Sequence, residues 1–214
     1  MTSSANAGLF ISFEGGEGAG KSTQLGRICK WLEAHGRDVV LTRQPGGTGY
    51  GKRIRKLILA PNPEEQLSAR AELFLYLADR AQHVDTVIRP ALKAGQIVLC
   101  DRYSDSTLAY QGYGRGLDID ELNTLNGLAT GQLNPDLTIW LDIDPAAGRE
   151  RILGRQALDR LEAESLAFHA RIRAGYAAMA AAEPQRWRRL DALASEELLF
   201  EQIQAVLNDR LPLS

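Results

Sequence analysis

The chain has few cysteines and no long apolar run. Its two cysteines, Cys29 and Cys100, form neither a metal-binding spacing nor a disulfide framework, which favours a reducing compartment. No stretch approaches the roughly 18 apolar residues of a membrane-spanning helix, and Met1 to Gly8 lacks the basic and apolar regions of a signal peptide. We therefore expect a cytoplasmic protein that does not bind to membranes.

A strong net charge is also absent. The 27 acidic and 25 basic residues give a formal charge of −2, which excludes a general attraction to a nucleic-acid polymer or an anionic membrane. Any affinity for phosphate must therefore be local. A chain of 214 residues with 44% hydrophobic content can bury one sizeable core, so we predict a single domain over residues 1–214.

Short apolar runs alternate with helical patterns along the chain. The run Leu9 to Phe13 precedes a glycine cluster, and Ser22 to Ala34 carries apolar residues at spacings of three and four. Further strands are predicted at 39–42, 97–100, 137–141 and 186–190, and helices at 69–94, 119–128, 146–153, 162–182 and 196–211. This alternation predicts an α/β fold, with a five-stranded parallel sheet covered by helices on both faces.

The glycine cluster after the first predicted strand matches the phosphate-binding motif G-x-x-x-x-G-K-[ST]. Its glycines let backbone N–H groups point at phosphate oxygens, and the following helix adds the positive end of its dipole. An ordinary glycine-rich turn is the alternative, but the flanking strand and helix favour ATP binding. The predicted ATP-binding residues are Gly15, Gly16, Glu17, Gly18, Ala19, Gly20, Lys21, Ser22 and Thr23.

Within this motif, Lys21 is expected at the β- and γ-phosphates, Ser22 at Mg²⁺ and Thr23 at the α-phosphate. Asp101 follows the apolar run 97–100, and a carboxylate at the end of a neighbouring strand can hold a metal-bound water, so we also assign it to Mg²⁺. The alternative role for Asp101 is a helix or turn cap. A dinucleotide site would need an acidic residue near Thr42, where the chain has none.

Phosphoryl transfer requires cations around the transferred group and an acceptor held in line. Arg55, Arg80 and Arg102 lie in or beside the predicted ligand-binding segments. So many arginines favour an acceptor that already carries a phosphate, rather than a nucleoside. A P-loop switch or assembly ATPase is the alternative from another class, although the guanine-specific N-K-x-D signature is absent from the sequence.

Several stretches together carry a family resemblance: Glu14 to Gln24, Arg43 to Thr48, Ala78 to His83, Asp101 to Tyr103, Ser106 to Gly112, Pro135 to Thr138 and Leu158 to Glu162. In this order, over nearly the whole chain, they resemble bacterial thymidylate kinase. The resemblance implies a P-loop nucleoside monophosphate kinase fold with a short lid. It also implies transfer of the γ-phosphoryl group of ATP to thymidine monophosphate, giving thymidine diphosphate for dTTP synthesis, with Mg²⁺ and a homodimer.

The resemblance implies that Tyr76 stacks on thymine, that Arg80 and Thr107 read the base, and that Tyr110 lies under the sugar and disfavours a 2′-hydroxyl. The full substrate side that it implies is Arg55, Tyr76, Arg80, Arg102, Ser106, Thr107, Tyr110 and Gln111, with Arg102 and Arg55 clamping the acceptor phosphate. On spacing alone Tyr76 could be plain core. His83 is interpreted as a polar helix residue, and 111–116 as a substrate-side loop.

The lid supplies the remaining cations. The variable positions of the P-loop contain Glu17 and no arginine, whereas residues 149–162 are rich in arginine and break at Gly154. The resemblance to the class with a lid arginine implies catalytic roles for Arg155, Lys21, Arg102 and Glu17, with Arg151 and Arg160 also binding ATP. The alternative is a solvated basic helix end.

Two positions depart from the family pattern. Gln44 stands where many relatives carry Glu, which removes a carboxylate expected near the sugar or metal waters. Leu153 replaces one lid arginine.

Overall fold

The computed structural model describes residues 8–62, 64–153 and 158–211. Its sheet has five parallel strands in the order β2-β3-β1-β4-β5. The strands are β1 (Leu9–Glu14), β2 (Val39–Arg43), β3 (Ile97–Asp101), β4 (Leu137–Asp142) and β5 (Trp187–Asp191). All predicted strands are confirmed, and each ends one residue later than predicted.

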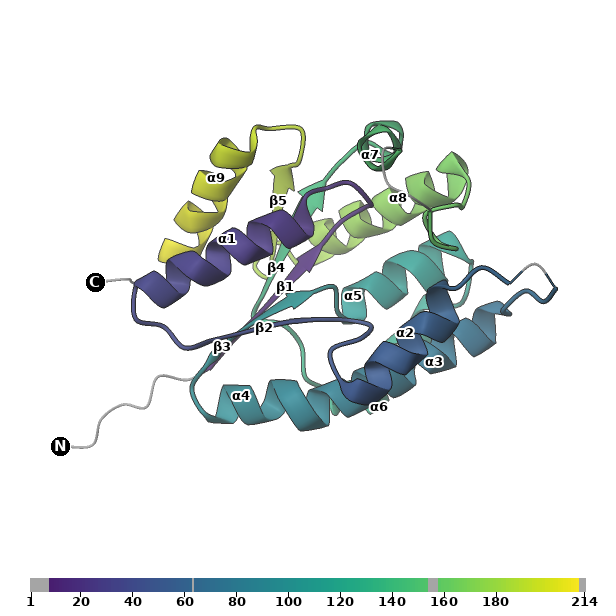
Figure 1. The fold of residues 1–214 in the computed structure, drawn as a ribbon, viewed down its shortest axis with the longest axis horizontal. Coiled ribbons are helices and arrows are strands. Elements are labelled where there is room, and N and C mark those ends of the chain that lie inside the picture. The colour runs from purple at the N-terminus through teal and green to yellow at the C-terminus, as the bar shows by residue number, and fades with distance from the viewer. Residues whose placement is uncertain (1–7, 63, 154–157, 212–214) are drawn as a thin grey trace.

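The register of the sheet brings the ends of three strands together. Phe13 of β1 pairs with Asp101 of β3, and Asp101 also pairs with Arg43 of β2. The strand order reverses on either side of β1, and ligands bind at such a switch point in open α/β sheets. The residues that follow β1, β2 and β3 therefore share one edge (Figure 1).

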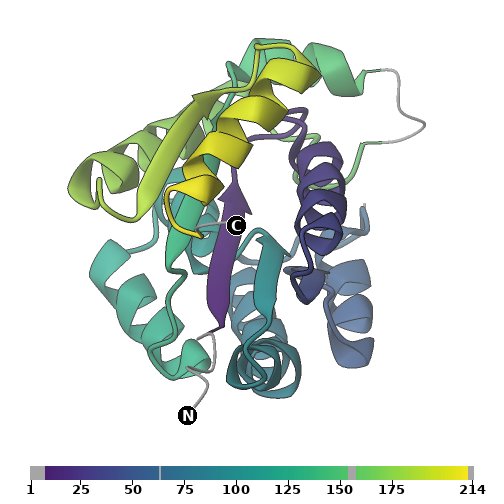
Figure 2. The ribbon, with the colours of Figure 1, turned by 90° about the vertical axis from the view of Figure 1, so that its left-hand side faces the viewer.

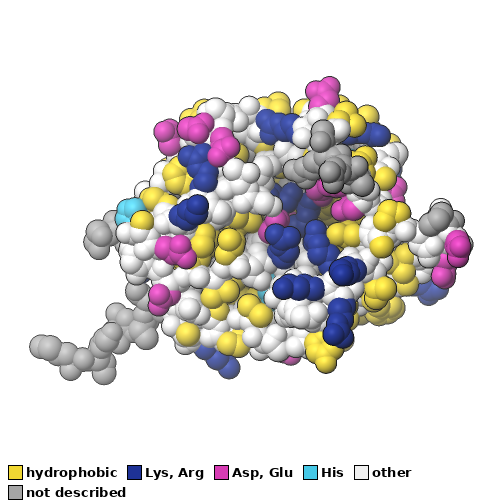
Figure 3. Space-filling model, in the orientation of Figure 1, with side chains coloured by type: hydrophobic (Ala, Val, Ile, Leu, Met, Phe, Trp, Pro, Cys, Tyr) yellow, Lys and Arg dark blue, Asp and Glu magenta, His cyan; other side chains and the backbone are white. Residues whose placement is uncertain are grey.

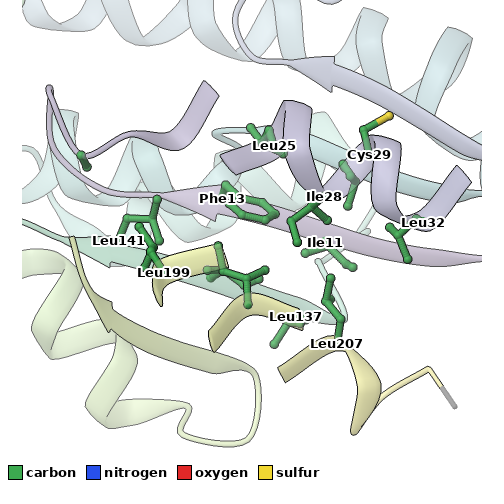
Figure 4. Packing of buried hydrophobic residues seen from close by; sticks show 14 of the residues in the cluster. Ile11, Phe13, Leu25, Ile28, Cys29, Leu32, Leu137, Leu141, Leu199 and Leu207 are labelled. Atoms are coloured by element: carbon green, nitrogen blue, oxygen red, sulfur yellow. The ribbon is translucent and has the colours of Figure 1, made fainter. Parts of the chain in front are cut away.

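One face of the sheet is covered by α1 (Lys21–Ala34) and α9 (Glu196–Asn208), which neighbour each other in Figures 1 and 2. Side chains alternate along a strand, so Ile11 and Phe13 point to this face together. They lie in one buried cluster with Leu25 and Ile28 of α1 and Leu199 of α9 (Figure 4). The apolar spacing predicted for the first helix is thus the spacing that packs it on β1.

The opposite face carries α3 (Ala69–His83), η1 (Val84–Ile88), α4 (Arg89–Lys93), α6 (Ile119–Thr130) and α8 (Leu166–Ala182), and α7 (Pro145–Ile152) follows β4. The single helix predicted over 69–94 contains the π-helical segment η1. Pro90 has no N–H to donate to the carbonyl of Thr86, and the wider turn lies where that α-helical bond is lost. Every helix in the described ranges is too short or too polar to cross a bilayer.

Two helical segments were not predicted. One is α2 (Gly49–Leu59), and the other is α5 (Ser104–Thr107) with the π-helical η2 (Leu108–Gly114). The loop predicted at 111–116 is therefore largely helical. Its glycines serve close packing, because a Cβ at Gly112 would lie 2.4 Å from the Ile119 side chain and one at Gly114 would lie 2.7 Å from the Phe168 ring.

The neighbouring leucines of α9 offer a test of the core. Leu199 is 3% exposed and Leu198 is 46% exposed. Leu199→Ala should lower the free energy of unfolding by about 2–5 kcal/mol, because it leaves a cavity between α9 and the sheet. Leu198→Ala, the matched control, should cost under about 1 kcal/mol. Urea unfolding followed by circular dichroism measures both, and equal losses would contradict this packing.

Candidate active site

The loop after β1 is shaped by glycines in conformations that other residues rarely adopt. Gly15, Gly18 and Gly20 have φ of 140°, 72° and 85°. A Cβ at Gly18 would also lie 2.4 Å from the carbonyl oxygen of Gly148 in α7. The loop therefore needs glycine for both its turn and its contact with α7, and it delivers the chain to the N-terminus of α1.

Lys21 lies over this loop at the start of α1. Its Nζ donates to the carbonyl oxygens of Gly15 at 3.1 Å and Gly16 at 2.8 Å. Burial and the nearby Arg102 guanidinium lower the pKa of its ammonium group. Within the described part of the chain this buried ammonium bonds only carbonyl oxygens, so it is well placed to exchange them for an anionic ligand.

Ser22 and Asp101 meet at the opposite side of the loop. The Ser22 hydroxyl donates to Asp101 Oδ2 at 3.1 Å, which joins the start of α1 to the end of β3. Hydroxyl and carboxylate oxygens are ligands that suit Mg²⁺. Among the described residues, no group of three or more His, Cys, Asp and Glu side chains is arranged so that it could hold a metal ion. A cation here would therefore have few ligands from the protein, and phosphate oxygens would supply others. This is the usual arrangement for Mg²⁺ in phosphotransferases.

Arg102 occupies the space between the loop and the helices behind the sheet. Its φ is 68°, and its guanidinium donates to the carbonyl oxygen of Gly15 at 2.9 Å and to Glu17 Oε1 at 2.5 Å. The guanidinium centre also lies 4.9 Å from the centroid of the Tyr110 ring. Arg102 therefore contacts both the P-loop and η2.

Glu17 is held between these cations. Tyr110 donates its hydroxyl proton to Glu17 Oε1 at 3.1 Å, beside the bond from Arg102. Burial acts to raise the pKa of Glu17, but the charges of Arg102 and Lys21 outweigh it and bring the pKa to about 2. The carboxylate is consequently ionised at neutral pH.

Arg80 supplies a second guanidinium to the site. It is buried, 2% exposed, and burial lowers its pKa. It donates to Gln44 Oε1 at 2.9 Å, Thr107 Oγ1 at 2.7 Å, Asn126 Oδ1 at 2.7 Å and the carbonyl oxygen of Tyr103 at 3.1 Å. The sequence placed position 44 near the sugar or metal waters. In the structure the Gln44 side chain lines the cleft, and its amide oxygen accepts from Arg80.

Most predicted site residues line one cleft at the carboxyl edge of the sheet. They are Glu17, Gly18, Ala19, Gly20, Lys21, Ser22, Thr23, Arg55, Tyr76, Arg80, Asp101, Arg102, Ser106, Thr107, Tyr110 and Gln111. Figure 3 shows Lys and Arg side chains gathered around a hollow on this face. Tyr76 both lines the cleft and packs against the core cluster of α8, so its two sequence interpretations are compatible.

Comparisons with known proteins agree with one another. The sequence profile described as Thymidylate kinase matches residues 13–203. A protein named thymidylate kinase from Solidesulfovibrio magneticus is 54% identical over 210 residues, 95% of this chain and 100% of that protein. One from Synechococcus sp. (strain JA-2-3B'a(2-13)) is 52% identical over 206 residues, 96% of this chain and 97% of that protein. The chain belongs to the thymidylate kinase family.

A solved thymidylate kinase has the same fold. The crystal structure from Ehrlichia chaffeensis has a TM-score of 0.76 and 32% sequence identity, and the match covers 94% of this chain and 99% of that one. The predicted α/β nucleoside monophosphate kinase fold, with its five-stranded parallel sheet, is confirmed. The roles of the individual site residues stay predictions.

The lid arginines of this thymidylate kinase family member lie in different places. Arg151 donates to the carbonyl oxygens of Gly18 at 3.3 Å and Ala192 at 2.9 Å, above the P-loop. Arg160 donates to the carbonyl oxygen of Ile58 at 2.8 Å and forms an ion pair with Glu72, so its guanidinium faces α3. Arg155 lies outside the described residues. To bind the phosphates of ATP, as predicted, Arg160 would have to break its ion pair with Glu72.

Two buried glutamates that contact predicted site residues were not themselves predicted. Glu72 accepts from Gln111 Nε2 at 2.8 Å and binds Arg160 and Arg115. The sequence signal that could have revealed Glu72 is its position within the apolar helix face around Leu73.

The second buried glutamate is Glu14, the last residue of β1. It accepts from the Tyr103 N–H at 2.7 Å, the Ser106 hydroxyl at 2.6 Å and the Tyr176 hydroxyl at 3.0 Å. Burial and the nearby Asp105 charge raise its pKa to about 7. Tyr176 and Ser106 also contact Arg102, at 3.3 Å and 3.4 Å. Glu14 therefore helps to position Arg102 through these two hydroxyl groups.

The low pKa of Glu17 predicts a pH dependence of stability. Because the pKa in the folded protein is about 2, below the ordinary value of 4.5, the stabilisation is present above pH 4.5 and is lost as the pH falls toward 2. Between about pH 5 and pH 3 the wild type should lose about 2 kcal/mol of unfolding free energy more than Glu17→Gln. Urea unfolding at both pH values tests this. Equal losses of unfolding free energy in the wild type and in Glu17→Gln would show that Arg102 and Lys21 do not stabilise the ionised Glu17.

Proposed function

We infer that the protein transfers the γ-phosphoryl group of ATP to thymidine monophosphate, giving thymidine diphosphate and ADP. One observation carries this: in a member of the thymidylate kinase family, a single cleft is lined by the P-loop and also by Tyr76, Arg80 and Arg102. The P-loop suits ATP, and an aromatic face beside two guanidinium groups suits a nucleobase and a phosphate.

On the donor side, backbone N–H groups of residues 15–22 and Lys21 bind the phosphates of ATP. Ser22 and Asp101 would hold Mg²⁺, and the contact between their oxygens supports this assignment. When bound, Mg²⁺ supplies positive charge to the β- and γ-phosphate oxygens. The protein's own contribution is to fix the donor at the edge of β1, next to Arg102.

On the acceptor side, Tyr76 stacks on the thymine, while Arg80, Thr107, Ser106 and Gln111 surround its edge. Tyr110 lies under the deoxyribose, beside Glu17. Arg102 and Arg55 bind the acceptor phosphate, and Arg55 is oriented by its bond to the carbonyl oxygen of Pro45 at 3.1 Å. An acceptor phosphate is already ionised, so the transfer needs charge and alignment and no general base.

The lid over residues 149–162 completes the site in the single domain 1–214. Arg155 meets the charge of the transferred group, and Arg151 and Arg160 assist at ATP. Arg151 already contacts the P-loop backbone, which supports its role. The protein works in the cytoplasm.

A coupled ADP-release assay tests the function. The acceptors are dTMP, dUMP, dCMP, AMP, GMP and thymidine, each with ATP and Mg²⁺, and EDTA serves as the metal-free control. We expect turnover with dTMP, weaker turnover with dUMP, and none in EDTA. Preference for another monophosphate would overturn the roles of Tyr76, Arg80 and Thr107, and no turnover at all would favour a P-loop switch.

The lid assignment predicts a separation of kinetic effects. Arg155→Ala should lower kcat on the order of 10³-fold, because an arginine at the transferred phosphoryl group acts mainly in the transition state. The KM for dTMP should change little. Steady-state kinetics test this, with Arg188→Ala on β5 as the control that removes an arginine outside the cleft. Unchanged turnover in Arg155→Ala would reject the assignment.

A homodimer is the proposed assembly. The helices α2, α3 and α6 pack in sequence, and each carries a large exposed apolar residue: Leu57 at 67%, Phe74 at 59% and Leu128 at 80%. Such residues on adjacent helices suit an interface between two copies. Phe74→Glu should give a monomer in sedimentation velocity, whereas the control Leu193→Glu should stay dimeric. A monomeric wild type would reject the proposal.

A further inference from the structure

The amide of Gln44 has only one orientation that agrees with its neighbours. Arg80 Nε lies 2.9 Å from Gln44 Oε1, and a guanidinium can only donate hydrogen bonds. The atom of Gln44 that faces Arg80 must therefore be its carbonyl oxygen. It follows that the amide NH₂ of Gln44 faces the other way, toward His83.

The orientation of Gln44 in turn fixes the proton on His83. Gln44 Nε2 lies 2.9 Å from His83 Nδ1, so Nδ1 must accept and carries no proton. A neutral imidazole then holds its proton on Nε2, which lies 2.7 Å from Thr42 Oγ1 and donates to it. Hydrogen bonds thus run from His83 to Thr42 and from Gln44 to His83, and Arg80 donates to Gln44.

His83 is enclosed so that it cannot easily turn away. It is fully buried, and a Cβ at Gly47 would lie 2.4 Å from its Nε2, so only glycine lets the turn approach the ring. Burial and the Arg80 charge lower the pKa of His83 to about 4, which keeps the ring neutral. The neighbouring carboxylate on α3, Asp79, accepts instead from the Gly46 N–H at 3.1 Å.

The bonds of Arg80 leave little freedom for its remaining donor. Of its five N–H groups, four meet the acceptors Gln44, Thr107, Asn126 and Tyr103 among the described residues. Because Arg80 lines the cleft, one N–H remains for a ligand there. The bond from Nε to Gln44 is one of the four contacts that set the direction of that N–H.

We propose that His83 is a positioning residue for base recognition, which acts through the Gln44 amide to fix the Arg80 guanidinium against the acceptor base. The proposal rests on the function inferred above and deepens it. The partner of Arg80 is a neutral amide, so both of its ends need a partner: its oxygen accepts from Arg80, and its NH₂ donates to the unprotonated Nδ1 of His83. A carboxylate at position 44 would not need this orientation, because both of its oxygens accept.

The tautomer of His83 provides a direct test that does not depend on turnover. Long-range ¹H–¹⁵N correlation on the ¹⁵N-labelled full chain at neutral pH reports which ring nitrogen carries the proton. The chain has three histidines, and His83→Asn assigns the signals of His83. We expect a proton on Nε2 alone. In Gln44→Glu a proton should appear on Nδ1, because a carboxylate can only accept. A wild-type proton on Nδ1 would overturn the proposal.

Kinetics test the consequence for the base. His83→Leu removes both ring nitrogens and should raise the KM for dTMP about tenfold, with kcat and the KM for ATP changed less than about twofold. The preference for dTMP over dCMP should also fall. His83→Asn should restore most of the loss, because its amide oxygen can accept from Gln44. His35→Leu, at the end of α1, is the control.

The outcomes separate this proposal from the function on which it rests. A wild type inactive on dTMP would reject the function. An active wild type with unchanged KM and base preference in His83→Leu would reject the role of His83 alone. If His83→Leu does not fold, the proposal is tested by the tautomer of His83 in the wild type and by its change in Gln44→Glu.

Discussion

The ion pair between Arg102 and Glu17 joins the two halves of the site. Arg102 follows β3 in a left-handed conformation, and Glu17 belongs to the P-loop after β1. The same guanidinium lies over the Tyr110 ring and bonds the carbonyl oxygen of Gly15. Because these groups lie on separate segments, one partly buried cation links the P-loop to η2.

Arg102 and Arg80 meet different kinds of partner. Arg102 is opposed by the carboxylate of Glu17, which partly neutralises it where a dianionic phosphate would bind. Arg80 is bonded by uncharged oxygens of Gln44, Thr107, Asn126 and Tyr103, so its charge is not cancelled by a direct partner among the described residues. An unneutralised donor is suited to an uncharged carbonyl, such as that of a pyrimidine base.

The parts of the molecule that were predictable depend on local patterns. Apolar runs gave the strands and their order of alternation, and the P-loop spacing gave the phosphate cradle. The identity of the acceptor base, thymine, was predicted from the family resemblance. The helix over 104–114 was missed because its glycines, such as Gly112, resemble a loop until their packing partners are known. Glu14 and Gln44 acquired roles from distant residues, Tyr176 and Arg80, whose approach only the tertiary fold determines.

A double-mutant cycle on Arg102 and Glu17 tests the central claim most directly. The free energy of unfolding would be measured by urea titration for wild type, Arg102→Met, Glu17→Gln and the double variant at neutral pH. If the pair joins the two halves, the double variant should lose less than the sum of the single losses, with a coupling of at least about 1 kcal/mol. Losses that add within about 0.5 kcal/mol would contradict the account.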